Sequence, residues 1–438
     1  MRKFLFTLAL GAIATFGAQA ASREFLSGYV GTVPPNTEDQ AKTYFDRPEV
    51  RKLLAALETG GIAETAAANM LAGTDTHLAD LERLHLVRDA NGTVRLGFPY
   101  FTAGDMAVIH AVAEKYVPSL VAAYKAREPE LDTILARYPV ASVDKKRLAF
   151  VLLAGFSLNW DALDQLTDKK YRQPFVIEGD GWHYGFWASE MVSDYSYKGF
   201  YWGSSSFPAD NINLTPPLDF TFSSFGDPES DPRMSFPDLL AMPEDQMTLP
   251  VRAAAEKLGL RDDNALGLDL KDVIGLSRAH DFGAILFALR NGAQTEANIC
   301  AAVAGEDATD CDGELGLLQT AGYAKASDDG NWFLLVPVLD TNDKPMLDAA
   351  LALSRGVMLD WLKTNYGPMR RELLRLTAVR QGIPYPELFS QIWHELFGLA
   401  TRDLVTEGVI EDPRATGVVW QGSIPAVWRT AIFPHAWQ

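Results

Sequence analysis

One pattern of secondary-structure signals occurs twice in this chain of 438 residues. In each copy an apolar helix is followed by two more short helices and then by a hairpin, over residues 51–101 and again over 282–340. The hairpins continue into similar stretches, LGFPYFT and LLVPVLDT, in which Pro99 and Pro337 are 238 residues apart (337 minus 99). A shared order of elements and a shared proline predict two copies of one module.

Local signals support the helices and hairpin of the first copy. An apolar helix over Val50 to Leu57 stops before Gly60-Gly61, and the spacing of Leu78, Leu81 and Leu84 puts apolar side chains on one face of the third helix. Asn91-Gly92 is a strong signal for a two-residue hairpin turn. Long helical stretches then follow each hairpin, over 105–138 and 345–381, and further amphipathic segments over 145–171 and 386–409. Pro118 and Gly367 are expected to bend or split the long helices.

The segment LERLHLVRDANGTVRL and the helices before it resemble winged-helix domains of bacterial transcription regulators. The resemblance covers about 110 residues over the two copies, is generic and identifies no subfamily. It implies a third helix that carries basic or amide side chains toward base edges. Here that helix departs from the pattern, because acidic residues outnumber basic ones in both copies: Asp75, Asp80 and Glu82 against Arg83, then Glu306, Asp307, Asp310, Asp312 and Glu314 with no basic residue. Acidic side chains repel phosphates, so we expect no nucleic-acid partner.

The first twenty residues have the organisation of a secretory signal peptide. Arg2 and Lys3 precede an uncharged apolar run from Phe4 to Phe16, and Ala18-Gln19-Ala20 provides a small-x-small cleavage site. The run is too short for a typical membrane span. We expect cleavage before Ala21, a periplasmic or secreted mature protein, and no membrane span in that protein.

Charge and cysteine content agree with export. Removal of Arg2 and Lys3 leaves 37 basic residues (39 minus 2) against 57 acidic ones, a net charge of −20 that repels nucleic acids and anionic lipid surfaces. The only two cysteines, Cys300 and Cys311, are close in sequence, and in an oxidising compartment they are expected to form one disulfide. Closing so short a loop stabilises the fold by about 2 to 3 kcal/mol in the chain-entropy model.

Residues 172–237 are rich in aromatic side chains with Gly and Ser between them, a composition typical of short strands and turns. Aromatic rings with polar tips could bind a glycan, a peptide or another amphipathic small molecule. The predicted ligand-binding residues are Trp182, Tyr184, Trp187, Tyr201 and Trp202. Alternatively, the same rings pack as the core of a small sheet against the helical modules.

Signals for catalysis are sparse. Asp161, His183 and Glu190 are the candidate catalytic residues, because carboxylates near aromatic walls serve as acid and base in glycosidases. Solvated turn and strand-edge acids are the alternative explanation. His394-Glu395 lacks the second histidine of a zinc protease motif, since Gly398 occupies that position. The sequence therefore predicts neither a metal site nor a cofactor.

The predicted fold is α+β and mainly helical, with two winged-helix-like modules that carry long helices. The expected organisation is a signal peptide over 1–20, a first module with its helices over 21–171, an aromatic β-rich insert and acidic connector over 172–280, and a second module with its helices over 281–438. The favoured function is non-enzymatic binding of a small molecule, a glycan or a protein partner. A periplasmic or secreted hydrolase acting on glycans or peptides is the alternative, and a purely structural interaction protein is the third hypothesis.

Overall fold

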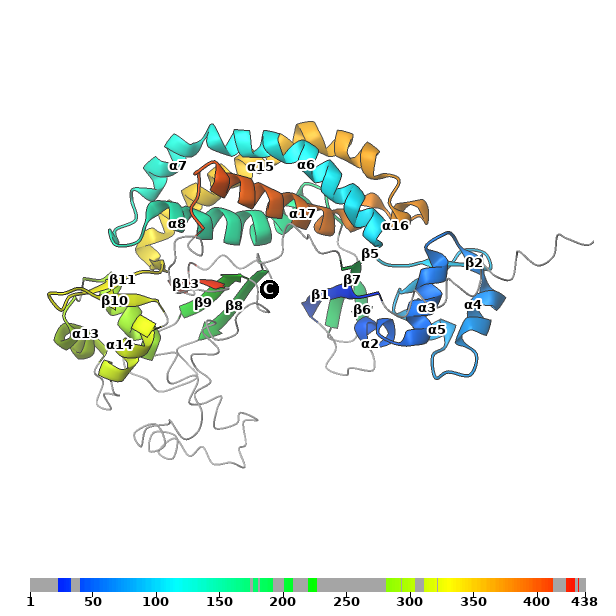
Figure 1. Cartoon of the computed structure of the whole chain (residues 1–438), viewed down its shortest axis with the longest axis horizontal. Helices are drawn as coiled ribbons and strands as arrows, with labels where there is room; N and C mark the ends of the chain where they lie inside the picture. Colours follow the sequence, from blue (N-terminus) through cyan, green and yellow to red (C-terminus); the bar gives the residue numbers. More distant parts are fainter. Residues whose placement is uncertain are drawn as a thin grey trace, which may run out of the picture.

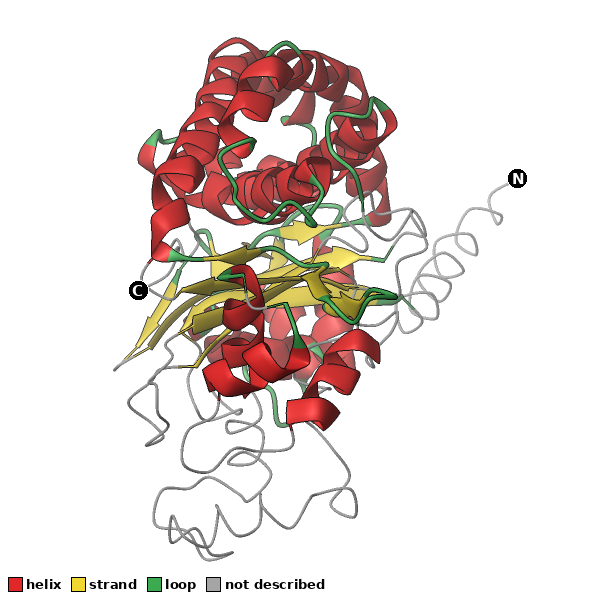
Figure 2. Ribbon diagram, turned by 90° about the vertical axis from the view of Figure 1, so that its left-hand side faces the viewer, coloured by secondary structure: helices red, strands yellow, loops and turns green. Residues whose placement is uncertain are grey.

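The computed structural model describes twelve stretches of the chain: residues 23–32, 40–173, 176–179, 182–191, 201–207, 220–226, 281–292, 294–303, 311–320, 322–412, 423–429 and 432. They form a mainly helical α+β fold, as predicted. A layer of long helices lies above two small sheets, and shorter helices lie below (Figures 1 and 2). The predicted signal peptide, the connector over 238–280 and much of the aromatic insert lie outside the described residues.

The first unit of short helices follows the predicted order. Its helices are α2 (Ala41–Phe45), α3 (Pro48–Leu57), α4 (Glu64–Leu71) and α5 (Leu78–Arg83). Its strands β2 (Ile62–Ala63), β3 (Val87–Asp89) and β4 (Thr93–Leu96) form an antiparallel sheet with β4 in the centre. Asn91 and Gly92 both have positive φ, 57° and 79°, as the tight turn between β3 and β4 requires. The Asn-Gly hairpin is therefore confirmed.

The second unit has the same order of elements. A helix over 281–290 precedes α13 (Glu296–Val303), α14 (Cys311–Thr320) and the antiparallel hairpin of β10 (Ala324–Ala326) and β11 (Trp332–Leu334). A bridge between Thr295 and Asn331 takes the place that the β2–β4 pairing has in the first unit. The predicted disulfide is present: it joins α13 to α14 through Cys300 and Cys311, whose Cα atoms are 5.7 Å apart.

The strand pairing after each hairpin also repeats. In one sheet β7 (Trp182–Glu190) pairs in parallel with β5 (Tyr100–Phe101) and antiparallel with β1 (Phe25–Thr32) and β6 (Ile177–Gly179). In the other, β13 (Ser423–Arg429) pairs in parallel with β12 (Val338–Leu339) and antiparallel with β9 (Phe220–Gly226), which also pairs with β8 (Tyr201–Phe207). The described strands of the aromatic insert therefore join two different sheets and form no sheet of their own.

The upper layer combines long helices from both halves of the chain (Figure 1). The first half supplies α6 (Ala103–Lys125), α7 (Glu128–Leu135), α8 (Lys145–Ala149), a π-helix η3 (Phe150–Asp161) and α9 (Ala162–Asp168). The second half supplies a 3-10 turn η7 (Thr341–Asp343), α15 (Lys344–Leu373), α16 (Thr377–Arg380) and α17 (Tyr385–Thr406). Helix α6 packs on α15 and α17, while α15 packs on η3 and α7. The halves are thus interleaved.

Matching caps begin the two longest helices. Thr102 and Asp105 form a capping box at the start of α6, and Asp340 and Asp343 form one at η7, directly before α15. Pro118 and Gly367 were expected to bend or split these helices, and neither position splits its helix, because α6 continues through Pro118 and α15 continues through Gly367 and Pro368. The helices end instead near Ala126 and Leu374, where the chain turns into the next helix.

Side chains from each half of the helical layer form hydrogen bonds with backbone groups of the other half. The hydroxyl of Tyr138, after α7, donates to the Val338 carbonyl and accepts from the Val338 amide, both at 2.9 Å. In the opposite direction, the Gln381 side chain, after α16, accepts from the Leu96 amide at 3.0 Å and donates to the Leu57 carbonyl. These buried bonds satisfy backbone groups of β12, of β4 and of the end of α3, and fix the layer on both units.

Among the described residues, α6 alone is long and apolar enough to cross a membrane by length and composition. The sequence had indicated no such segment after the signal peptide. In the structure α6 lies between α15 and α17 and buries Ile109, Val117 and Leu120 among its neighbours. Helices in the cores of soluble proteins often have the same composition, so we describe α6 as a core helix.

Candidate functional site

Asp161 lies at the end of η3, in the middle of the helical layer. Its two carboxylate oxygens accept hydrogen bonds from Nε and Nη2 of Arg355 on α15, each at 2.7 Å, and its side chain is 7% exposed. A two-point pair of this kind is the strongest form of arginine–carboxylate contact. Asp161 therefore connects the first half of the chain to the second.

A second polar contact lies beside this pair. Ser157, also on η3, donates to the Ser354 hydroxyl at 2.7 Å, and the Tyr124 hydroxyl is 2.7 Å from the same oxygen. All three side chains are buried. Burial raises the pKa of Tyr124, so this hydroxyl stays protonated and serves only in hydrogen bonding. A π-helix as long as η3 is rare, since most π-helical segments are single turns inside α-helices.

Two basic groups lie near the same end of η3. Arg172, after α9, donates to the Ser390 hydroxyl on α17 and to Thr167 on α9, and burial lowers its pKa to about 10. One turn along α17, the His394 ring is 2.6 Å from the Ser390 carbonyl, and burial lowers its pKa to about 4. His394 is thus neutral at pH 7 and well placed to donate to that carbonyl.

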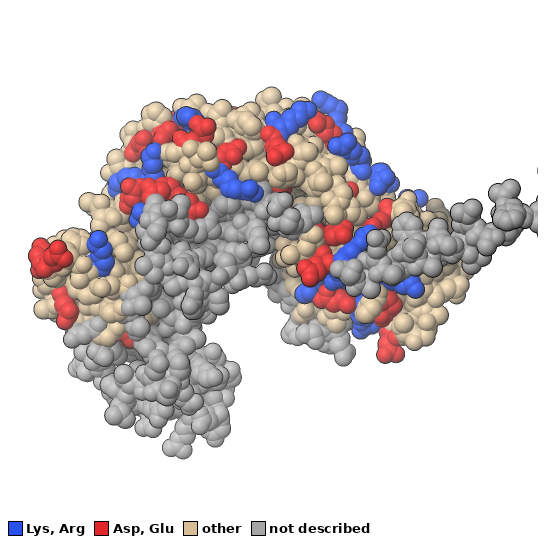
Figure 3. Space-filling view, in the orientation of Figure 1, with Lys and Arg blue, Asp and Glu red and all other residues tan. Residues whose placement is uncertain are grey.

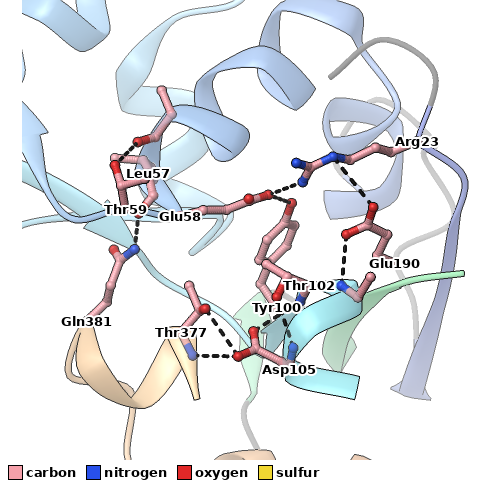
Figure 4. Close-up of polar contacts among 12 residues, drawn as sticks. Arg23, Leu57, Glu58, Thr59, Tyr100, Thr102, Asp105, Glu190, Thr377 and Gln381 are labelled. Carbon is pink, nitrogen blue, oxygen red and sulfur yellow. Dashed lines mark hydrogen bonds and ion pairs between the residues drawn. The ribbon is translucent and has the colours of Figure 1, made fainter. Parts of the chain in front are cut away.

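Glu190 takes part in a separate polar network that includes Glu58 at the end of α3 in the first unit (Figure 4). One oxygen accepts from the Ala103 amide at 2.8 Å, and the other is 3.5 Å from Nε of Arg23. Arg23 also pairs with Glu58 at 2.7 Å, and the Tyr100 hydroxyl donates to the same Glu58 oxygen. Burial, followed by the Glu58 carboxylate, raises the pKa of Tyr100. Glu190 therefore joins the N-terminal segment to the start of α6.

His183 lies apart from the other two candidate catalytic residues. It is exposed on β7, opposite Thr32 of β1 and Glu178 of β6. Asp161 and Glu190 are each paired with an arginine of their own, Arg355 and Arg23. The three residues belong to separate environments, so the structure does not bring them together as one catalytic group.

The predicted ligand-binding aromatics have different environments. Tyr184 is fully buried, and its hydroxyl accepts from the Ala41 amide at 2.9 Å. Its ring packs edge-on against Tyr29, in a cluster of rings that lines the core between the first sheet and the first unit: Phe25, Phe45, Phe98, Tyr100 and Phe186. Tyr184 is therefore a core residue here, because its face of β7 packs on α2.

Trp187 points to the opposite face of β7, since successive strand residues alternate in direction. It is half-buried and covers Gly28 of β1, where an added Cβ would lie 3.0 Å from the indole ring. Glycine at position 28 thus leaves room for the indole. Trp182 lies on β7, and Tyr201 and Trp202 lie on β8, but their side chains are outside the described residues.

The structure also contains polar pairs that the sequence did not single out. Nδ1 of His110 on α6 is 2.5 Å from a carboxylate oxygen of Glu395 on α17, which is 1% exposed, and its Nε2 is 3.3 Å from Glu114. Asp105 accepts from the amide and hydroxyl of Thr377, which begins α16. Across the described ranges, no group of three or more His, Cys, Asp or Glu side chains has the arrangement of a metal site.

Asp164 provides a pH-dependent test of the region around Asp161. Burial, followed by the charge of Asp161, raises the pKa of Asp164 to about 6. A raised carboxyl pKa means that the folded state favours the protonated form, so stability falls as pH rises from about 4 to about 6. We expect Asp164→Asn to gain stability over the wild type across this interval in urea unfolding. An unchanged difference between pH 4 and pH 7 would contradict the assignment.

Comparison of the chain with protein family models, curated proteins and solved structures gave no match.

Proposed function

We propose that this chain is an exported, non-enzymatic binding protein built on a duplicated winged-helix-like scaffold that has lost DNA binding. The duplication is supported by the repeated order of elements and by the parallel pairs β5–β7 and β12–β13. The winged-helix interpretation is supported by the order helix, short strand, helix, helix, hairpin in the first unit. The two units lie below the two ends of the helical layer (Figure 1).

The observation that supports the loss of DNA binding is the acidic charge of the third helix in each unit. In the first unit α5 exposes Glu82 and half-exposes Asp80, which is 3.9 Å from the nearby Arg83. In the second, α14 contains Asp312 and Glu314 and no basic residue. A helix of this charge is repelled by phosphates, whereas it can contact a protein or a basic ligand.

Binding is favoured over hydrolysis by the contacts of the candidate carboxylates. A catalytic carboxylate needs an oxygen that is directed at substrate. Asp161 instead accepts two bonds from Arg355, and Glu190 accepts from the Ala103 amide beside Arg23. These contacts support structural roles for both carboxylates.

Export is supported by the predicted signal peptide and by the disulfide between Cys300 and Cys311. The N-terminus of protein recovered from the exporting compartment is expected to be Ala21.

The loss of DNA binding is tested by gel retardation. With the mature protein at micromolar concentration and physiological salt, we expect no retention of mixed-sequence duplex DNA, because the chain and both third helices are acidic. Retention that weakens with added salt and disappears when α5 or α14 is altered would refute the proposal.

Partner binding is tested by photo-crosslinking in the exporting cell. A photo-reactive residue replaces Glu82 on α5 or Gln319 on α14, both of which are exposed. We expect one discrete adduct from these sites and none from exposed Asp132 on α7, which serves as the control. Equal labelling at all three positions, or labelling at none, would argue against the two units as the binding surface.

A further inference from the structure

Exposed arginines gather where α15 ends and α16 begins. Arg370 and Arg371 lie in the last turn of α15, Arg375 lies in the following turn, and Arg380 ends α16, all four exposed. Figure 3 shows blue side chains along this upper right edge of the helical layer. We name these four residues the arginine patch. Its charge is opposite to the net charge of the chain, −18.

The patch has little internal neutralisation. Within the described part of the chain, none of its four arginines forms an ion pair, and Arg380 makes one long hydrogen bond to Thr377 at 3.3 Å. Glu372 lies among them in sequence, but its carboxylate already accepts from Lys115 and from the Tyr116 hydroxyl, both at 2.7 Å. Its negative charge is therefore balanced mainly from α6, with a smaller contribution from Arg375, and the arginines remain available to an external anion.

An apolar side chain lies within the patch. Leu374 is 46% exposed and sits between Arg371 and Arg375 in sequence. Among the described residues, only Met191 is another large hydrophobic side chain with this degree of exposure. Basic residues at the C-terminus of a helix interact favourably with the helix dipole, which explains the arginines in the last turn of α15. It does not account for Arg375, which lies beyond the helix, or for an exposed leucine.

We propose that the arginine patch docks the protein on an anionic phospholipid surface. Guanidinium groups bind phosphates through paired donors, and four of them spread along a helix end fit an extended array of headgroups. Leu374 at the same place can enter the apolar boundary of the bilayer, whereas a nucleic acid offers it no comparable environment. Screening limits repulsion from acidic side chains elsewhere on the protein to about 8 to 10 Å. This proposal goes beyond partner binding and does not depend on it.

The test uses the chain without its first twenty residues. It measures how much of this protein sediments together with lipid vesicles. Neutral phosphatidylcholine vesicles are compared with vesicles in which about a third of the lipid is phosphatidylglycerol. Each basic residue near an anionic surface strengthens partitioning roughly fivefold. We expect binding only to the anionic vesicles, reversal by high salt, and a loss of roughly six hundredfold when Arg370, Arg371, Arg375 and Arg380 are all changed to Gln, which is fivefold for each of the four.

A matched variant controls for net charge. It carries Arg83→Gln, Arg127→Gln, Arg137→Gln and Arg402→Gln, four exposed arginines outside the patch, and is expected to bind like the wild type. Leu374→Ala should weaken binding about fivefold, and Leu374→Trp should add blue-shifted emission with anionic vesicles. Circular dichroism confirms that each variant is folded. Equal loss in the two arginine variants, no binding at low salt, or patch-dependent binding to duplex DNA without binding to vesicles would overturn the proposal.

Discussion

Replacing Tyr184 with Ala is expected to lower the free energy of unfolding by about 3 to 5 kcal/mol. The ring is fully buried within the aromatic cluster on one face of β7, and its hydroxyl accepts a hydrogen bond from the Ala41 amide. Truncation leaves a cavity and an unsatisfied backbone donor at the start of α2. Urea unfolding followed by circular dichroism measures the loss, and Tyr184→Phe isolates the contribution of the hydroxyl.

Trp187→Ala is the matched control on the same strand. Its indole is half-buried on the other face of β7, so the expected loss is smaller, about 1 to 2 kcal/mol. If Trp187 contacts a ligand, its substitution weakens binding more than it weakens the fold. Equal effects of the two substitutions on stability would contradict the different roles that the structure gives to the two faces.

Replacing Asp161 with Ala is expected to lower the free energy of unfolding by about 3 kcal/mol. The substitution removes a buried carboxylate and leaves the Arg355 guanidinium without its two acceptors in a half-buried position. The partial exposure of Arg355 keeps the loss at the lower end of the range for broken buried pairs. Chemical unfolding of the variant measures it.

Two further variants test whether the loss of stability comes from breaking a buried ion pair. Changing Arg355 to Met in the Asp161→Ala background should recover part of the stability, because no uncompensated charge remains. Asp360→Ala breaks a fully exposed pair with Lys363 on α15 and should leave stability unchanged within error. A loss with Asp360→Ala as large as that with Asp161→Ala would mean that burial of the pair is not the source of the effect.

Signals local in sequence predicted much of the fold. The Asn91-Gly92 turn, the periodic leucines of α5 and the close pair of cysteines each depend on a few neighbouring residues, and the structure contains the hairpin, the helix and the disulfide. The expected interruption at Pro118 is an exception. Pro118 lies inside α6, since tertiary packing on α15 and α17 can outweigh the local cost of a missing hydrogen bond.

Contacts between distant residues could not be predicted in this way. Asp161 and Arg355 are 194 positions apart, and nothing in the local sequence of either indicates the other. The unusual length of η3 is equally invisible, because the apolar segment FVLLAGFSLNWD fits an ordinary buried helix. Tyr184 and Trp187 were grouped by composition, and only the pairing of β7 with β1 separates their faces.

The exchange of contacts between halves bears on how such a chain could have arisen. A polypeptide containing one half alone would expose the apolar surface of α6 that α15 and α17 now cover. Two copies of it could cover that surface by forming a twofold homodimer, in which each subunit caps the strand ends of the other. Fusion of the two genes makes the same assembly independent of protein concentration. Fusion would also release each half to diverge.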